Sequence, residues 1–280
     1  MSNHGQEFGR LVHIIATLRG PDGCPWDREQ TLRSLSQFVL EEAYEVVDAI
    51  ERGDLDALCE EIGDHIFEGV FLARIASDLG AFDVADTLRT VSDKLIRRHP
   101  HVFRHDGVVH DAASKERAPS ADAALSRWDA QKAEERAAAG QTGQTLGGLP
   151  KGLPALLLAY KLGKRAAAAG FDWSKTTDVI EKIEEEVAEL RDVIERHPGD
   201  TGHAEEEMGD LLFAIANLSR KLGIEPEAAL RRASQKFTGR FNAMEATIAA
   251  SRRRMHEMSL EELEREWQRT KSQEQIAREL

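Results

Sequence analysis

The sequence predicts an all-α protein in which one helical-bundle domain is duplicated in tandem. Apolar residues recur at steps of three and four, and β-branched runs with a period of two are absent. Two acidic segments about 145 positions apart repeat one pattern. Because 280 residues are enough for two domains, we expect an N-terminal domain over residues 1–105, a helical and flexible linker over 106–152, and a C-terminal domain over 153–280.

The first acidic segment is predicted to form two antiparallel helices. A packed stripe steps by four, three and four residues through Val39, Ala43, Val46 and Ile50. Arg52-Gly53-Asp54 then provides turn residues, in which glycine suits the end of one helix and aspartate the start of the next. A turn this short places consecutive helices side by side.

The second acidic segment predicts the same arrangement. Its apolar stripe contains Ile180, Ile183, Val187, Leu190 and Ile194. Turn residues follow at His197-Pro198-Gly199-Asp200. Further on, Ser259 and Glu262 have the spacing of a capping box, so we expect a last helix to begin there.

Each acidic segment places five carboxylates at similar spacings. The pattern is EExxE followed by ExxD, with an offset of 16 positions from Glu45 to Glu61 and 18 from Glu189 to Glu207. The first set is Glu41, Glu42, Glu45, Glu61 and Asp64, and the second is Glu185, Glu186, Glu189, Glu207 and Asp210. Residues three or four apart share one helix face, so each set should converge between its two helices.

Such a convergence favours a cation site. Carboxylates held close together repel one another, and at least one would take up a proton unless a cation lies among them. Oxygen ligands alone suit Mg²⁺, or Mn²⁺ as a substitute, rather than zinc. A single EExxE is more often a solvated helix face, but its repetition together with ExxD favours a functional site in at least one copy.

Basic residues repeat as well, because Lys94 and Arg98 match Lys236 and Arg240. Each pair is four residues apart and presents two cations on one helix face, which suits phosphate oxygens. The alternative is that these cations form ion pairs with the excess of acidic residues. The predicted last helix carries Trp267, which would either stack on a nucleobase or pack as an ordinary aromatic residue.

Composition restricts the class of protein. Hydrophobic residues make up 41% of the chain and charged residues 31%, as in folded globular proteins. The net charge of −13 argues against general nucleic-acid binding. No apolar run is long enough to span a membrane, the N-terminal residues lack the apolar core of a signal peptide, and the two cysteines imply no disulfide framework. We therefore expect a cytoplasmic protein with no membrane contact.

Several motifs occur in a fixed order along nearly the whole chain. They lie at residues 23–27, 40–48, 97–103, 153–156, 170–173, 206–213 and 259–267. This set resembles the MazG family of nucleoside triphosphate pyrophosphohydrolases in its two-domain form. The resemblance implies tandem bundles of the all-α NTP pyrophosphohydrolase type, Mg²⁺ dependence and a homodimer. The implied reaction is hydrolysis of NTPs or dNTPs at the α-phosphorus to NMP and pyrophosphate, which serves as housekeeping of the nucleotide pool.

The resemblance also implies roles for particular residues. The metal ligands and the general base would lie among Glu185, Glu186, Glu189, Glu207 and Asp210. Glu186 or Glu189 would orient or deprotonate the attacking water, and Lys236 and Arg240 would stabilise the departing pyrophosphate. Further candidates for substrate binding are His203, Trp267 and Lys271.

In two-domain members the C-terminal half is implied to be catalytic, with the N-terminal half aiding assembly. The chain departs from the family pattern at His65, where the family usually has leucine, and at Gln235, where asparagine is common. We expect His65 to loosen the N-terminal carboxylate site, because it brings a polar ring to a packing position.

Three alternatives were weighed against this interpretation. A ferritin-type di-iron site needs Glu-x-x-His on two helices, and that spacing is absent from the chain. A non-catalytic scaffold or regulator stabilised by a cation is the main alternative, above all for the N-terminal half. A transition-metal site at His99, His101, His105 and His110 is disfavoured by their irregular spacing. The carboxylate pattern leaves base preference, sugar preference and target nucleotide undetermined.

Overall fold

The computed structural model describes residues 3–104, 106–110, 120, 121, 123, 124, 127, 128, 131, 135, 145–197 and 199–279. Within these ranges the chain forms helices joined by turns, apart from one antiparallel bridge between Phe103 and Val109, so the all-α prediction is confirmed. His105 and most of the predicted linker lie outside the described residues. The chain divides into two compact units, residues 1–135 and 136–280. The predicted boundaries at 105 and 153 stay a prediction.

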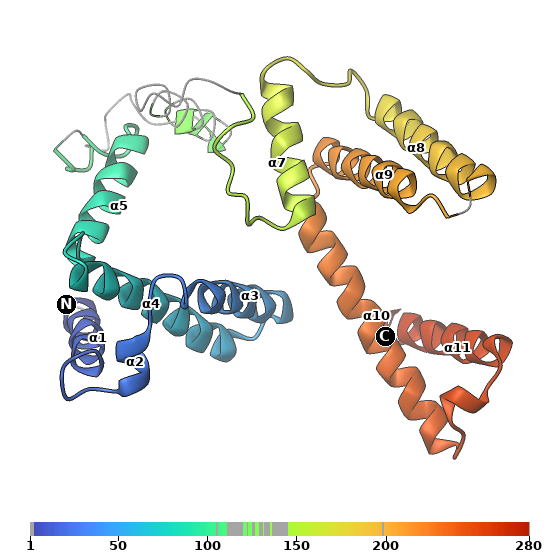
Figure 1. Ribbon diagram of the computed structural model, residues 1–280, viewed down its shortest axis with the longest axis horizontal. Coiled ribbons are helices and arrows are strands. Elements are labelled where there is room, and N and C mark those ends of the chain that lie inside the picture. Colours follow the sequence, from blue (N-terminus) through green and yellow to red (C-terminus); the bar gives the residue numbers. More distant parts are fainter. Residues whose placement is uncertain are drawn as a thin grey trace. The chain divides into compact units, whose positions relative to one another are not determined.

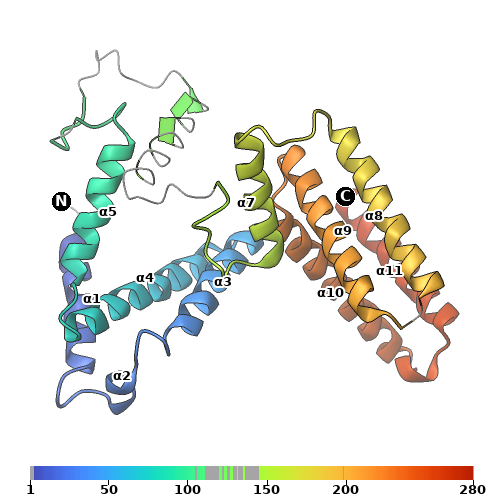
Figure 2. The same ribbon diagram turned by 45° about the horizontal axis from the view of Figure 1, so that its top comes forward.

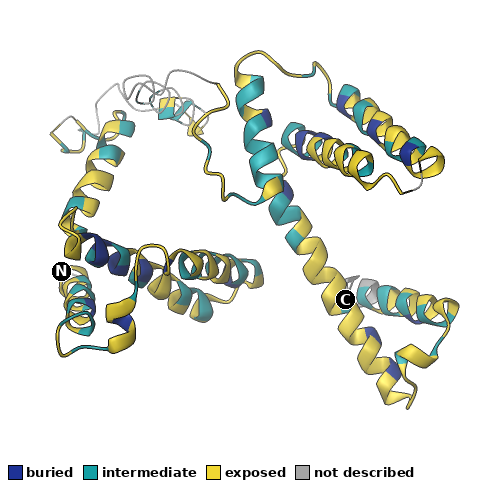
Figure 3. Cartoon of the chain, in the orientation of Figure 1, coloured by how far each residue is buried: buried dark blue, intermediate teal, exposed yellow. Residues whose placement is uncertain are grey.

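The first unit is built on the antiparallel pair α3 (Ser36–Arg52) and α4 (Leu55–Asp78). Figures 1 and 2 show α1 (His4–Leu18) and the short α2 (Pro25–Glu29) at one end of α4, from which α5 (Val84–Arg98) continues. The core of this unit contains Ile15, Leu35, Val70, Phe71 and Ile75. Burial is therefore concentrated in the C-terminal half of α4, as Figure 3 shows.

The turn between α3 and α4 has the chemistry that the sequence predicts. Gly53 ends α3 in the left-handed region, with φ of 69°, which glycine adopts without a side-chain clash. Asp54 caps α4, because its Oδ1 accepts a hydrogen bond from the backbone N–H of Ala57 at 3.0 Å. Tight connection at this point keeps α3 and α4 side by side.

The second unit repeats this pair as α8 (Thr176–Arg196) and α9 (Thr201–Lys221). Here Asp200 caps α9 through a 3.2 Å hydrogen bond from the backbone N–H of His203. The preceding α7 (Ala155–Ala168) packs against α9, and Figure 1 shows α7, α8 and α9 together. Of the predicted turn, Pro198 lies outside the described residues.

The remaining helices form a long hairpin. Helix α10 (Pro226–Ala250) leads through a 3₁₀ turn at Met255–Glu257 to α11 (Leu260–Glu279), which packs back on α10 (Figure 2). The predicted capping box at Ser259 and Glu262 is confirmed, because the two residues exchange hydrogen bonds of 2.9 and 3.3 Å. None of the described helices is long and apolar enough to cross a membrane.

Candidate carboxylate metal site

Three of the predicted carboxylates converge in the second unit. Oxygens of Glu186 on α8 and of Glu207 and Asp210 on α9 all lie within 4.8 Å of one another. Their convergence follows from the sequence, because Glu207 and Asp210 are three apart on one face of α9, and that helix runs antiparallel beside α8. Glu186 is only 3% exposed, whereas Asp210 is exposed, so the cluster has a buried floor and an open side.

The buried carboxylate of Glu186 has one satisfied oxygen and one unsatisfied oxygen. Lys182, one turn earlier on α8, places its Nζ 2.7 Å from Glu186 Oε1 and 2.9 Å from Glu185 Oε1. These two carboxylates, Glu186 first, hold the pKa of Lys182 above its ordinary value. Within the described part of the chain, Glu186 Oε2 is buried without a hydrogen-bond partner. A buried oxygen in an all-oxygen cluster fits a hard cation such as Mg²⁺.

Glu189 lies at the edge of this cluster. Its side chain is exposed, and it lies outside the group of three converging carboxylates. Desolvation, followed by the negative charges of Glu207 and Glu186, nevertheless raises the pKa of Glu189. A carboxylate of raised pKa beside a metal-binding cluster is suited to accept a proton.

The predicted phosphate ligands are distributed over three helices. His203 is one turn before Glu207, and its Nε2 lies 3.0 Å from Glu207 Oε1. Arg240 on α10 forms an ion pair with Glu274 of α11. Lys236 is exposed on α10, and Lys271 is partly buried on α11.

Trp267 packs against another aromatic residue in the α10–α11 hairpin. Its ring centroid lies 5.2 Å from that of Phe237, with the planes inclined by 46°. Packing of this kind is one of the two roles that the sequence left open for Trp267, and it leaves the nucleobase role as a prediction.

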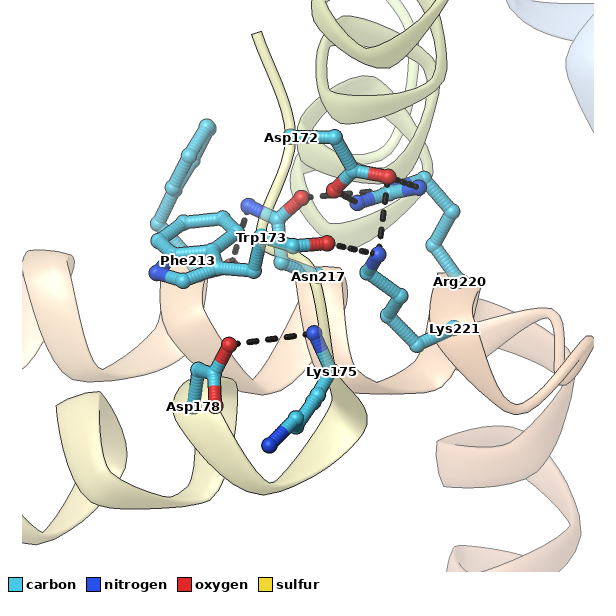
Figure 4. A network of polar contacts seen from close by, with 8 residues as sticks. All are labelled: Asp172, Trp173, Lys175, Asp178, Phe213, Asn217, Arg220 and Lys221. Carbon is cyan, nitrogen blue, oxygen red and sulfur yellow. Dashed lines mark hydrogen bonds and ion pairs between the residues drawn. The ribbon is translucent and has the colours of Figure 1, made fainter.

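A polar network fixes the segment that leads into α8 to the end of α9, as Figure 4 shows. Asp172 accepts from both terminal nitrogens of Arg220, at 2.5 and 3.3 Å, and from Lys221 Nζ at 2.8 Å. The hydrogen bond from Arg220, ahead of that from Lys221, lowers the pKa of Asp172 to about 2. Lys221 also donates to the carbonyl oxygen of Trp173. The network thereby connects the beginning of α8 with the C-terminal end of α9.

The network and the ion pair of Glu186 contain residues to which sequence reasoning assigned no role. Lys182 was detectable, since it lies four residues before Glu186 on a predicted helix. Asp172 was noticed only as part of a repeated motif, and its partners Arg220 and Lys221 are 48 and 49 positions away. No local spacing rule connects residues so far apart.

The first unit contains an equivalent cluster. Oxygens of Glu42 on α3 and Glu45 and Glu61 on α3 and α4 lie within 4.8 Å of one another. Desolvation and then Glu45 raise the pKa of Glu42, and desolvation and then Glu45 also raise the pKa of Glu61. Glu42 is further affected by Asp64 and Glu41, so all five predicted carboxylates interact electrostatically. His65 is exposed in this unit rather than packed.

The histidine alternative gains no support from the structure. Among the residues that the structure describes, both groups with the geometry for a metal ion consist of carboxylates alone. His110 instead contacts the carbonyl oxygen of Pro100 through its Nε2 at 2.9 Å, and His99 contacts that of Leu95 at 2.7 Å.

Comparison with known proteins matches both carboxylate segments to one family. The model of the MazG nucleotide pyrophosphohydrolase domain matches residues 30–103 and 175–244. A nucleoside triphosphate pyrophosphohydrolase of Escherichia coli K12 is 43% identical over 269 residues, which cover 96% of this chain and 98% of the relative. A nucleoside triphosphate pyrophosphohydrolase/pyrophosphatase MazG of Thermotoga maritima is 40% identical over 271 residues, or 97% of this chain and 98% of the relative. The uncharacterized protein YabN of Bacillus subtilis is 39% identical over 269 residues, which cover 96% of this chain and 52% of YabN.

Proposed function

Because this chain belongs to the MazG nucleotide pyrophosphohydrolase family, we propose that it is an Mg²⁺-dependent nucleoside triphosphate pyrophosphohydrolase. It would hydrolyse NTPs or dNTPs at the α-phosphorus and release NMP and pyrophosphate. The observation that carries the proposal is the unpartnered buried oxygen of Glu186, which lies among Glu207 and Asp210 inside the second matched segment.

Glu186, Glu207 and Asp210 would hold the cation, with Glu185 and Glu189 beside them. When bound, Mg²⁺ neutralises phosphate charge and lowers the pKa of a coordinated water; Mn²⁺ is a plausible substitute because it prefers the same oxygen ligands. Lys182 would keep Glu186 ionised and fixed in direction, because its ammonium group binds one of the two carboxylate oxygens.

Glu189 is the carboxylate best suited to be the general base. Its exposed position gives water access, and its raised pKa favours taking a proton on a carboxylate oxygen. As that proton leaves the water, its oxygen forms a bond to the α-phosphorus, and the bond from that phosphorus to the bridging oxygen of the β-phosphate breaks. Lys236 and Arg240 would stabilise the charge that develops on the departing pyrophosphate.

Arg240 must exchange its contact with Glu274 for a phosphate in order to act in this way. We assign His203 and Lys271 to the same task of binding phosphate, and Trp267 to the nucleobase. Each of these assignments concerns a side chain on the helices that carry or follow the carboxylate cluster.

The test is hydrolysis in ¹⁸O-labelled water. The full chain is incubated with Mg²⁺ and each NTP and dNTP, the products are separated by anion exchange, and the label is located by mass spectrometry. The proposal predicts NMP carrying ¹⁸O and unlabelled pyrophosphate. Label in pyrophosphate would indicate attack at the β-phosphorus, and no turnover with any nucleotide would favour the scaffold alternative.

Two matched variants connect the activity with the cluster. Glu207→Gln should lower kcat by at least about 100-fold, since it removes a charged cation ligand. Glu205→Gln removes the same charge from an exposed position of the same helix and should leave kcat within about twofold. Equal activity of the two variants would place the chemistry elsewhere.

We also propose a homodimer. Helices α8 and α9 expose large apolar residues that a two-helix pair does not cover: Ile180, Val187, Ile194, Met208, Leu212, Phe213 and Ile215. A second copy would complete the bundle around this surface. Light scattering during size-exclusion chromatography tests it, and a mass near 31.2 kDa would contradict it.

A further inference from the structure

The two carboxylate clusters have the same sequence pattern but different surroundings. In the second unit, Lys182 lies beside the buried Glu186, and Ala214 follows Asp210 by one helical turn. At the corresponding positions the first unit has Phe38, four residues before Glu42, and Glu68, four residues after Asp64. Relative to the second cluster, the first therefore lacks a cation and has an additional carboxylate.

Glu68 belongs to the cluster by its position on α4. Glu61, Asp64 and Glu68 are separated by three and then four residues, so they follow one stripe of the helix. Glu68 is 6% exposed, which makes it more buried than the other carboxylates of this unit. The charges of Glu42 and Asp64 act on it, after desolvation, to raise its pKa, as expected for a side chain that faces the cluster.

Two buried carboxylate oxygens in this region are unsatisfied. In the part of the chain that the structure describes, Glu68 Oε2 and Glu42 Oε2 are both buried without a hydrogen-bond partner. A buried charge without a partner is costly, and a buried polar group without a hydrogen bond requires an explanation. A hard cation would satisfy both oxygens at once.

We propose that the α3–α4 cluster is a divalent-cation site of its own, in which Glu68 is the innermost ligand beside Glu42, Glu45 and Glu61. The site fills without a nucleotide, because its own carboxylates carry more negative charge than one divalent cation can neutralise. The α8–α9 cluster, by contrast, already contains the positive charge of Lys182. The cation of the first unit stabilises the α3–α4 pair whether or not the protein hydrolyses nucleotides.

The test is Mn²⁺ binding by the full chain without nucleotide, in which electron paramagnetic resonance measures free Mn²⁺. The tightest site of the wild type should persist in Glu207→Gln, which alters the second cluster, and weaken at least about tenfold in Glu68→Gln. Glu60→Gln, an exposed position on the same helix, loses the same charge and should bind as the wild type does. Unchanged binding in Glu68→Gln, or loss of the tightest site in Glu207→Gln, would overturn the proposal.

Thermal unfolding provides a readout that does not depend on activity. Glu68→Gln removes a buried charge and keeps the shape of the side chain, so in EDTA it should melt no lower than the wild type. Adding Mn²⁺ should raise the melting temperature of the wild type and of Glu60→Gln more than that of Glu68→Gln. An equal rise in all three proteins would show that Glu68 holds no cation. Glu68→Leu provides a second test of the same position if the amide variant folds poorly.

Discussion

Gly163 of α7 and Asn217 of α9 are in direct contact, because the side-chain amide of Asn217 occupies the space that a β-carbon at Gly163 would need. Asn217 is 2% exposed. Its Nδ2 donates to the carbonyl oxygen of Phe213 at 3.3 Å, and its Oδ1 accepts from Arg220 Nε at 3.3 Å. The glycine thus allows α7 to approach α9 and leaves the amide free to orient Arg220 toward Asp172.

Gly163→Ala should destabilise the second unit by about 1–3 kcal/mol, because an added methyl group forces the buried amide to move. Gly239→Ala in α10 is the matched control, since a β-carbon there meets no heavy atom within 4 Å. The control should gain about 0.5–1 kcal/mol from helix propensity. Urea unfolding followed by circular dichroism measures both. A similar gain in both variants would show that the contact is not restrictive.

Stability below pH 4 should depend on Asp172. Its pKa is lowered from 3.8 to about 2 by Arg220 and Lys221, so its contribution is complete above about pH 4 and is lost as the pH falls toward 2. Asp172→Asn should lower the melting temperature at pH 7 and flatten its dependence on pH between 4 and 2. The control Asp192→Asn disrupts a more exposed pair with Arg196 and should change little. Parallel pH curves for the wild type and Asp172→Asn would contradict the assignment.

Removal of Lys182 should make the second unit depend on divalent cations for stability. In Lys182→Met the buried Glu186 loses its counter-charge. We expect a lower melting temperature than the wild type in EDTA and a larger rise on adding Mg²⁺. Arg191→Met removes a positive charge from an exposed position of α8 and should show neither effect. If Lys182→Met is destabilised equally in EDTA and Mg²⁺, the lysine has no link to the cation site.

Kinetics can separate the two roles of Trp267. If its ring stacks on the nucleobase, Trp267→Leu should raise KM about tenfold, since stacking is worth about 1–3 kcal/mol. Phe237→Leu disrupts the same aromatic contact but keeps the tryptophan, so its KM should change less. An equal rise in both variants would indicate that Trp267 acts only through the packing of α10 on α11.

Local sequence signals predicted much of the fold. Gly53 and Asp54 end one helix and begin the next because their conformational and capping preferences act within a few residues. The convergence of Glu186 with Glu207 and Asp210 also followed from helical spacing and a short turn. Both inferences needed only the geometry of a helix pair.

Other features depended on contacts between distant parts of the chain. Helical spacing did not indicate that Arg240 pairs with Glu274, because the two residues are 34 positions apart and meet only when α11 packs on α10. The difference between the two carboxylate clusters was likewise missed. The EExxE and ExxD patterns are the same in both, whereas Phe38 and Glu68 lie outside the patterns and become relevant only through burial.

The ion pair between Arg240 and Glu274 has a consequence for the choice of anion. If Arg240 receives phosphate as proposed, an incoming anion must displace a carboxylate that belongs to the same chain. A tethered competitor acts at a high effective concentration that does not change with dilution. Orthophosphate, which offers few charges, would compete poorly against it, whereas a triphosphate engages several cations at once. The α10–α11 hairpin would in this way set a charge threshold that favours the substrate over small inorganic anions.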